Sequence, residues 1–489
     1  MERRFSLRAS LPYLGVGLGA ALAAVLVAAL LTNIFERKQE AKNPYLKLVE
    51  LSEDDVDPKK WGANWPRQYD GYRRTEEASA TRYGGGLIGP EGGLPPQKSD
   101  KYPWLRRIFA GYLFAVDYRD RRGHAYMLKD QEVTRRNVPE ENKQSGNCLH
   151  CHASVMPLYR SLGREALPQG SQQEQIFAGL EKVGAMNYWD AHRLLSQTSG
   201  GAHPLSCVDC HDPDSMELRV TRPAFIRAVG DLAASSAAVP HLASIERWRA
   251  GGRNTRYDPN RDATRQEMRS FVCGQCHVEY FCGKGMTIFF PWAKGLKVEE
   301  IESNYADMQV DGKPFRDWVH AETGFAQFKA QHPEFEVWSQ GIHARSGVAC
   351  ADCHMPYKRE GALKISEHWV RSPLLQVSRS CGACHPGSEQ DMLERAYAIQ
   401  DRHAALLERA GAAAVEAIDA MAALRRERGD GDPRLPELEK LQRAAQWRLD
   451  FVAAENSMGF HAPQELARIL GESIDMFRKA QVLALQSIR

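Results

Sequence analysis

The sequence predicts a mainly α-helical protein with little β structure, and three features of its 489 residues lead to this prediction. A motif of two cysteines and one histidine recurs five times between residues 148 and 385. Beyond residue 390 the chain has no cysteine, and its Ala, Leu, Glu and Arg residues follow a helical period. No alternation of strands and helices of the βαβ kind is evident. We therefore expect a compact core built around the motif, followed by long C-terminal helices.

The composition is that of a globular protein, with 43% apolar and 26% charged residues. Lys and Arg total 64 against 62 Asp and Glu, which gives a net charge of +2. No block of basic residues with interleaved aromatics runs along the chain, so we expect no nucleic-acid partner. Eleven cysteines are too few for a small disulfide scaffold of this length.

Residues 1–40 have the pattern of an export segment. Arg3, Arg4 and Arg8 precede an uncharged run from Ala9 to Phe35. This run exceeds the core of a signal peptide, about 7–15 residues, and reaches the roughly 20 residues that span a bilayer. No convincing small-residue cleavage site follows it. We interpret the segment as an uncleaved membrane anchor that places the rest of the chain in the periplasm. A cleavable signal and a buried core helix are the alternatives.

Ten of the eleven cysteines form five copies of the pattern C-x-x-C-H, the signature of covalent c-type haem attachment. Two thiols about one helical turn apart can form thioethers to one porphyrin, and the adjacent imidazole can then ligate its iron. The copies are Cys148-Cys151-His152, Cys207-Cys210-His211, Cys273-Cys276-His277, Cys350-Cys353-His354 and Cys381-Cys384-His385. The sequence therefore predicts a multihaem c-type cytochrome core with five covalently bound haem c groups.

Three other chemistries use paired cysteines. Zinc sites do not need a histidine after every second cysteine. A thioredoxin-like motif occurs once and within a βαβ unit. Disulfides suit an exported protein, but five two-residue loops would be an odd framework. The remaining cysteine, Cys282, is expected to be a buried small hydrophobe.

The number of histidines separates an electron carrier from an enzyme. Of 16 histidines, five belong to the motifs and eleven remain. If every iron had two histidine ligands, the protein would only carry electrons. If one iron lacked a second ligand, it could bind a small substrate. Motif spacing alone does not decide which haem that would be.

Five segments, listed below, closely resemble cytochrome c nitrite reductase, the ammonia-forming pentahaem enzyme called NrfA. They are Met268–Tyr280, Lys329–Pro333, Gly341–His343, Cys350–Pro356 and Phe460–Pro463, and the likeness extends from about residue 60 to the end. The resemblance implies four distal ligands, His124, His343, His368 and His461, and four bis-His haems that relay electrons. It leaves the haem of Cys148 and Cys151 open as the catalytic one. Taken singly, each of the four histidines could instead be a core or surface residue.

The resemblance also implies a pocket of Arg136, Tyr280 and His332 above the open iron. A guanidinium attracts nitrite, and His and Tyr can donate protons to the departing oxygens. Arg135 is the alternative to Arg136, and either arginine could instead pair with a haem propionate. In the best-known members of the family, the residue after the second cysteine of the catalytic haem motif is a lysine. This chain has His152 at that position, as a subset of the family does. We interpret His150 as a spectator.

A calcium site beside the active haem is implied by the same resemblance. Its ligands would be Glu279, Tyr280, Lys329 and Gln331, with the lysine contributing its carbonyl. Carboxylate, carbonyl and amide oxygens are hard ligands that suit Ca²⁺.

The C-terminal region shows helical periodicity over residues 391–428 and 434–456, and a third helix is expected from Pro463 towards Ile488. The family is a homodimer with its interface on such helices; the alternative is that they cover the haem core. We thus expect an anchor at 1–40, a pentahaem catalytic domain at 41–389 and a dimerising region at 390–489.

Two functions remain. The first is six-electron reduction of nitrite to ammonium, with electrons from a membrane quinol-oxidising multihaem cytochrome or a soluble donor. The second is electron transfer alone, with every iron saturated. An intermediate possibility is the same enzyme with hydroxylamine, nitric oxide or sulfite as its main substrate.

Overall fold

This computed structural model describes residues 7–42, 47–77, 79–84, 93–137, 144–283, 287–310, 312–361 and 363–486. The chain divides into two units. The first comprises residues 1–50 and 358–365, and the second comprises residues 51–357 and 366–489.

The first unit contains a long apolar helix, α1 (Leu7–Lys42), and most of a hairpin of β5 (Tyr357–Glu360) and β6 (Leu363–Ser366). The segment Pro12–Glu36 of α1 has a mean hydropathy of 2.5 and none of it is buried. By length and composition this helix could cross a membrane, a test that a signal sequence would also pass. Arg3 and Arg4 lie outside the described residues.

The second unit is made of helices joined by short turns, with a few very short strands. Its helices before residue 389 are α2 (Pro58–Asn64), α3 (Pro66–Arg73), α4 (Lys98–Lys101), α5 (Trp104–Ile108), α6 (Leu113–Val116), α7 (Met127–Val133), α8 (Leu149–His152), α9 (Met156–Ala166), α10 (Gln172–Ala185), α11 (Tyr188–Ser199), α12 (Pro223–Ala234), α13 (Ala243–Ala250), α14 (Pro259–Asp262), α15 (Arg265–Gly274), α16 (Val298–Ala306), α17 (Glu334–Gln340), α18 (Ile342–Arg345), α19 (Cys350–His354) and α20 (Val377–Ser380). Single 3₁₀ turns are η1 (Arg74–Glu76), η2 (His124–Tyr126), η3 (Arg135–Asn137), η4 (Gly146–Cys148), η5 (Cys207–Asp209) and η6 (Pro373–Leu375). Two antiparallel pairs join β1 (Gln309–Val310) to β2 (Lys313–Pro314) and β3 (Trp318–Val319) to β4 (Ala326–Gln327).

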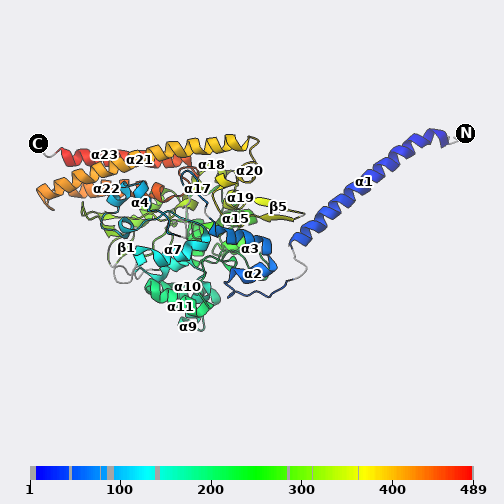
Figure 1. The fold of residues 1–489 in the computed structure, drawn as a ribbon, viewed down its shortest axis with the longest axis horizontal. Helices are drawn as coiled ribbons and strands as arrows, with labels where there is room; N and C mark the ends of the chain where they lie inside the picture. Colours follow the sequence, from blue (N-terminus) through cyan, green and yellow to red (C-terminus); the bar gives the residue numbers. More distant parts are fainter. Residues whose placement is uncertain are drawn as a thin grey trace. The chain divides into compact units, whose positions relative to one another are not determined.

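Three long helices close the chain and lie along one side of this unit (Figure 1): α21 (Glu389–Arg428), α22 (Leu435–Ala454) and α23 (Pro463–Leu485). Ser388 and Asp391 form a capping box that starts α21, and basic residues fill its last turn. The predicted mainly helical fold with long C-terminal helices is therefore confirmed. The predicted helix bounds differ from these by a few residues at most.

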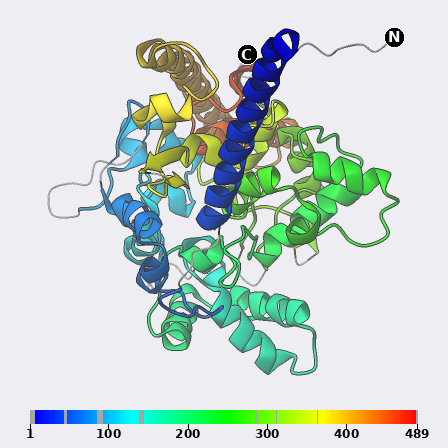
Figure 2. The same cartoon turned by 90° about the vertical axis from the view of Figure 1, so that its right-hand side faces the viewer.

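The C-terminal helices belong to one of two apolar clusters. In it, the alanine-rich face of α21 packs against aromatic side chains such as Trp104 and Trp447. A Cβ at Gly411 of α21 would lie 2.5 Å from the Trp104 ring, so only glycine allows this close approach. Helices α9, α10 and α11 gather on the opposite side of the unit (Figure 2).

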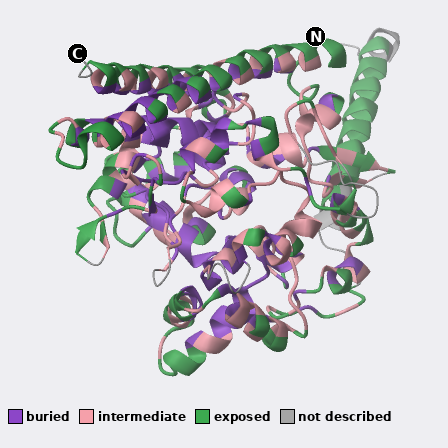
Figure 3. Cartoon of the chain, turned by 60° about the vertical axis from the view of Figure 1, so that its left-hand side comes forward, coloured by how far each residue is buried: buried purple, intermediate pink, exposed green. Residues whose placement is uncertain are grey.

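The second apolar cluster borders the first, third and fourth motif segments. It contains Phe225, Phe271 and Phe335, and Cys148 and Tyr280 pack against it. Figure 3 shows buried residues on the inner faces of the C-terminal helices and exposed residues on their outer faces. Closely packed aromatic side chains thus hold these motif segments in place.

Candidate active site

Each C-x-x-C-H motif folds into a tight helical turn. The backbone N–H of the motif histidine donates to the carbonyl of the first cysteine in three copies, at 2.9–3.0 Å, in His211, His277 and His385. This turn brings the imidazole to the same side as the first thiol. No disulfide joins any of the eleven cysteines. The described residues also contain no group of three or more His, Cys, Asp or Glu that could hold a metal by themselves, as a zinc site would require.

Four motif histidines each face one histidine from a distant part of the chain. The pairs, with distances between ring centroids, are His277 and His124 at 6.3 Å, His211 and His368 at 6.3 Å, His385 and His343 at 6.4 Å, and His354 and His461 at 6.4 Å. Two metal–nitrogen bonds of about 2.0 Å, plus about 1.1 Å from each nitrogen to its ring centre, give roughly 6.2 Å. The spacing of all four pairs therefore fits one iron between two imidazoles. The second member of each pair is a distal ligand expected from the sequence.

The hydrogen bonds of three of these imidazoles fix which ring nitrogen carries the proton. Nδ1 contacts a backbone carbonyl in His211, His354 and His368, at 2.9–3.0 Å. A carbonyl only accepts, so Nδ1 carries the proton and Nε2 is the acceptor nitrogen of the ring. Metal-binding histidines are oriented in this manner. His461 differs, because its Nδ1 lies 2.6 Å from a carboxylate oxygen of Glu455.

The fifth motif histidine, His152, has no such partner. Its Nδ1 donates to the carbonyl of Met127 at 3.0 Å. Its Nε2 therefore accepts from the amide of Gln131, at 3.3 Å. No histidine ring in the described part of the chain pairs with it at the distance seen in the other four. The five motifs thus divide into four paired histidines and one unpaired histidine.

The three expected pocket residues come from separate segments near His152. The rings of Tyr280 and His332 lie 6.5 Å apart and nearly parallel, at 30°. Arg136 is half-buried, its guanidinium 4.2 Å above the Phe114 ring, whereas the neighbouring Arg135 is exposed. Burial lowers the pKa of His152 to about 4, and the charge of Arg136 acts in the same direction. Arg136 is thus less exposed than Arg135, and its charge acts on His152.

Protons are held in this pocket over a wide pH range. Burial raises the pKa of Tyr280 well above its usual value, so the phenol stays protonated. Burial lowers the pKa of His332 to about 3, so near neutral pH the ring is uncharged and keeps one N–H.

Two of the four residues expected to bind calcium are in direct contact. The Glu279 carboxylate accepts from the backbone N–H of Gln331 at 2.6 Å and from the Tyr305 hydroxyl at 2.8 Å. The Lys329 ammonium is directed away, to Asp450 at 3.0 Å. Of the four predicted ligands, the structure thus joins Glu279 and Gln331 directly, and Tyr280 and Lys329 are close to them in the chain.

Sequence reasoning missed two buried carboxylates. Glu455 binds His461, and Glu334 lies between His277 at 3.8 Å and His332 at 4.0 Å. No motif marks either glutamate, although Glu334 follows His332 by two residues. Cys282, expected to be buried, is half-buried and packs against the second apolar cluster.

Comparisons with known proteins agree with one another. Residues 57–488 match the family Cytochrome c552. Cytochrome c-552 of Bacteroides fragilis is 34% identical over 474 residues, which cover 94% of this chain and 84% of that protein. The cytochrome c nitrite reductase subunit NrfA of Nitratidesulfovibrio vulgaris is 31% identical, with 96% of this chain and 86% of that protein covered.

Among solved structures, the fold is similar to the catalytic subunit NrfA of cytochrome c nitrite reductase from Desulfovibrio desulfuricans, which was described with two calcium sites. The TM-score is 0.68 at 27% identity, covering 90% of this chain and 88% of that one. The chain therefore belongs to the cytochrome c552 family, the family of the NrfA-type cytochrome c nitrite reductases.

Proposed function

We propose that this protein is a pentahaem cytochrome that reduces nitrite to ammonium at one open haem iron, while four bis-His haems relay electrons. The observation that carries the proposal is the division of the motif histidines. His211, His277, His354 and His385 each face a second histidine at 6.3–6.4 Å, and His152 faces none. An electron carrier would need a partner for His152. An enzyme needs that position free for its substrate.

The haem held by Cys148, Cys151 and His152 would supply the iron that binds nitrite and the route by which electrons arrive. The lone pair of His152 Nε2, which accepts from Gln131, is the one that iron binding would use, so the Gln131 amide has to turn away. Met127 would keep the ring oriented by accepting from Nδ1 at 3.0 Å.

The residues of the pocket would bind the anion and deliver protons. Nitrite takes up six electrons and eight protons to give ammonium and two waters. The guanidinium of Arg136 attracts the anion and stabilises charge on its oxygens. The Tyr280 hydroxyl and the His332 N–H donate to those oxygens as they leave, and solvent protons restore both groups.

We further propose a calcium ion held by Glu279, Gln331 and the carbonyls of Tyr280 and Lys329. The carboxyl group of Glu279 is fully buried, and burial raises its pKa well above the usual range because it destabilises the ionised form. A calcium ion beside the group would stabilise that ionised form. The ammonium of Lys329 already pairs with Asp450, which leaves the carbonyl as the ligand. The ion would lock the two segments that carry Tyr280 and His332.

The remaining parts of the chain complete the proposal. Residues 1–40 would anchor the protein to the inner membrane, with residues 41–389 as the catalytic domain in the periplasm. Residues 390–489, with the exposed outer face of α21, would form the interface of a homodimer. Electrons would come from a membrane quinol-oxidising multihaem cytochrome or from a soluble donor.

Nitrite turnover by the purified holoprotein with a reduced low-potential dye tests the function. We expect one ammonium and six dye electrons per nitrite, and a high-spin signal from one haem in five. If all haems are low-spin and no ammonium forms, the protein is an electron carrier. Parallel assays with hydroxylamine, nitric oxide and sulfite rank the related substrates.

Removal of calcium is expected to lower the rate of ammonium formation without loss of haem. A chelator withdraws the ion from Glu279 and Gln331, and the segments that position Tyr280 and His332 then become mobile. The rate before and after chelation is the measurement, with bound calcium counted by atomic spectroscopy. Re-addition of Ca²⁺ should restore the rate, and Mg²⁺ should not, because it demands a smaller octahedral site. An unchanged rate in calcium-free protein would exclude the site.

Replacement of Glu455 by glutamine is expected to raise the reduction potential of the haem between His354 and His461. The carboxylate accepts from His461 Nδ1 at 2.6 Å and so makes the imidazole a stronger donor to ferric iron. Its loss should shift the potential upward by about 60 mV, which corresponds to a tenfold change in the equilibrium constant of a one-electron couple. Spectroelectrochemical titration measures this. Glu472→Gln, at a partly buried ion pair with Arg448 between α22 and α23, is the control and should leave all potentials in place.

A further inference from the structure

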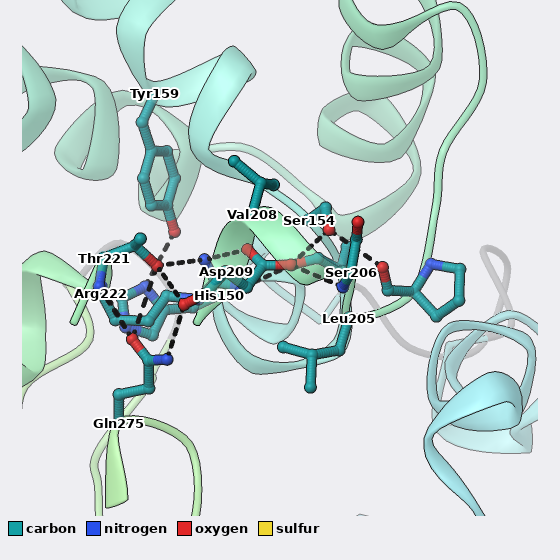
Figure 4. A network of polar contacts seen from close by, with 12 residues as sticks. His150, Ser154, Tyr159, Leu205, Ser206, Val208, Asp209, Thr221, Arg222 and Gln275 are labelled. Carbon is teal, nitrogen blue, oxygen red and sulfur yellow. Dashed lines mark hydrogen bonds and ion pairs between the residues drawn. The ribbon is translucent and has the colours of Figure 1, made fainter. Parts of the chain in front are cut away.

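A buried ion pair joins three of the haem-attachment segments (Figure 4). Arg222 and Asp209 are both 0% exposed, and the guanidinium Nη1 donates to Asp209 Oδ1 at 2.8 Å. Asp209 is the third residue of the motif Cys207–His211. Arg222 stands immediately before α12. Neither residue belongs to the pocket or to any histidine pair, and no sequence motif marks Arg222.

The same two residues reach the segment of the unpaired histidine. Arg222 Nη2 donates to the carbonyl of Ala153, directly after His152, at 2.8 Å. The hydroxyl of Ser154 donates to Asp209 Oδ2 in a short hydrogen bond. The first attachment segment, residues 148–154, is thus held from two consecutive positions.

A third segment is joined through Gln275, which lies between the two cysteines of the motif Cys273–His277. Its amide N–H donates to the carbonyl of Asp209 at 3.0 Å, and its amide oxygen accepts from the backbone N–H of Arg222 at 3.2 Å. Asp209 and Gln275, each directly before the second cysteine of its motif, therefore connect the two motifs.

This arrangement is poorly explained by stability alone. Burial of an arginine and an aspartate has a desolvation cost that their attraction roughly offsets, and apolar residues of similar size often serve as well. A guanidinium that donates from two nitrogens to two different groups, in contrast, fixes the distance and angle of each of them.

We propose that Arg222 is a positioning residue that sets the mutual placement of the haems on Cys148–Cys151, Cys207–Cys210 and Cys273–Cys276. The inference rests on the proposed function for the identity of the open haem. Arg222 touches the backbone after His152, the motif residue Asp209 and the motif residue Gln275. Electron transfer between haems depends steeply on their separation, so this one side chain controls delivery of electrons to the open haem.

The test compares holoproteins with Arg222→Met and Arg222→Lys. Both should retain five haems per chain by mass. We expect a changed magnetic coupling between neighbouring ferric irons in electron paramagnetic resonance. The kcat for nitrite should fall several-fold, because displaced haems slow the transfer of electrons to the open haem. The KM should change less than kcat, because Arg222 contacts none of the side chains Arg136, Tyr280 and His332. Lysine keeps the charge but binds at one point, so Arg222→Lys should be intermediate.

Two further variants separate positioning from stability. Arg222→Met with Asp209→Asn removes both charges, and should recover thermal stability while the coupling stays altered. Arg256→Met removes an exposed ion pair with Asp231 on the outer side of α12, and should match the wild type. Wild-type coupling and kcat in both Arg222 variants would overturn the inference. Failure of the proposed function gives a different result, a wild type that itself lacks a high-spin haem and forms no ammonium.

Discussion

Replacement of His332 by alanine is expected to lower kcat for ammonium formation from nitrite by about a hundredfold to ten-thousandfold, the usual contribution of one positioned proton donor. The ring centroids of His332 and Tyr280 lie 6.5 Å apart. Because burial lowers its pKa, the His332 ring is neutral near pH 7 and carries one N–H that it can donate. Without it, protons reach the departing oxygens only from Tyr280 or from water. Dye-linked turnover with ammonium detection measures the loss.

The binding step provides the internal control for this prediction. Nitrite should still shift the spectrum of the open haem in His332→Ala, because Arg136 remains. Arg136→Ala should weaken that binding, and Arg135→Ala should not, since the Arg135 side chain is exposed. His192→Ala, which removes a half-buried histidine that contacts Glu132 at 3.0 Å, should retain full turnover. Full turnover in His332→Ala instead would remove this residue from the mechanism.

Local patterns allowed much of this fold to be predicted from the sequence. The three C-terminal helices have helical periodicity, a capping box at Ser388 and a break at Gly429, so their ends are encoded within a few residues. The five motifs are equally local, because one helical turn sets both thiols and the imidazole.

The contacts that complete the site are not encoded locally. Glu455 lies six residues from His461, yet only the turn after α22 brings its carboxylate to Nδ1. Arg222 and Gln275 meet Asp209 through packing of segments far apart in the chain. Gln131 reaches His152 from α7 in the same way. Single residues of ordinary type gain their role from tertiary placement, so no spacing rule could identify them.

Replacement of Asp450 by asparagine is expected to destabilise the protein by about 3–5 kcal/mol, the usual effect of leaving a buried charge without its partner. Asp450 on α22 is 0% exposed and pairs with the Lys329 ammonium, 1% exposed, at 3.0 Å. Its second oxygen accepts from the backbone N–H of Ala330 at 2.8 Å. At roughly 0.9 kcal/mol per degree for a chain of this length, the thermal midpoint should fall by about 3–5 °C.

The same pair connects stability to catalysis. Lys329, Ala330, Gln331 and His332 are consecutive, so α22 holds the end of the segment that carries the proton donor. Asp450→Asn should therefore lower kcat as well as the midpoint in circular dichroism. The control is Asp419→Asn. Asp419 forms an ion pair with Arg107 and its side chain is 61% exposed, so this substitution should lower the free energy of unfolding by no more than about 1 kcal/mol. If the two variants lose equal stability, the buried pair contributes no more than a surface one. If Asp450→Asn loses stability but keeps wild-type kcat, His332 is held by the other contacts of its segment.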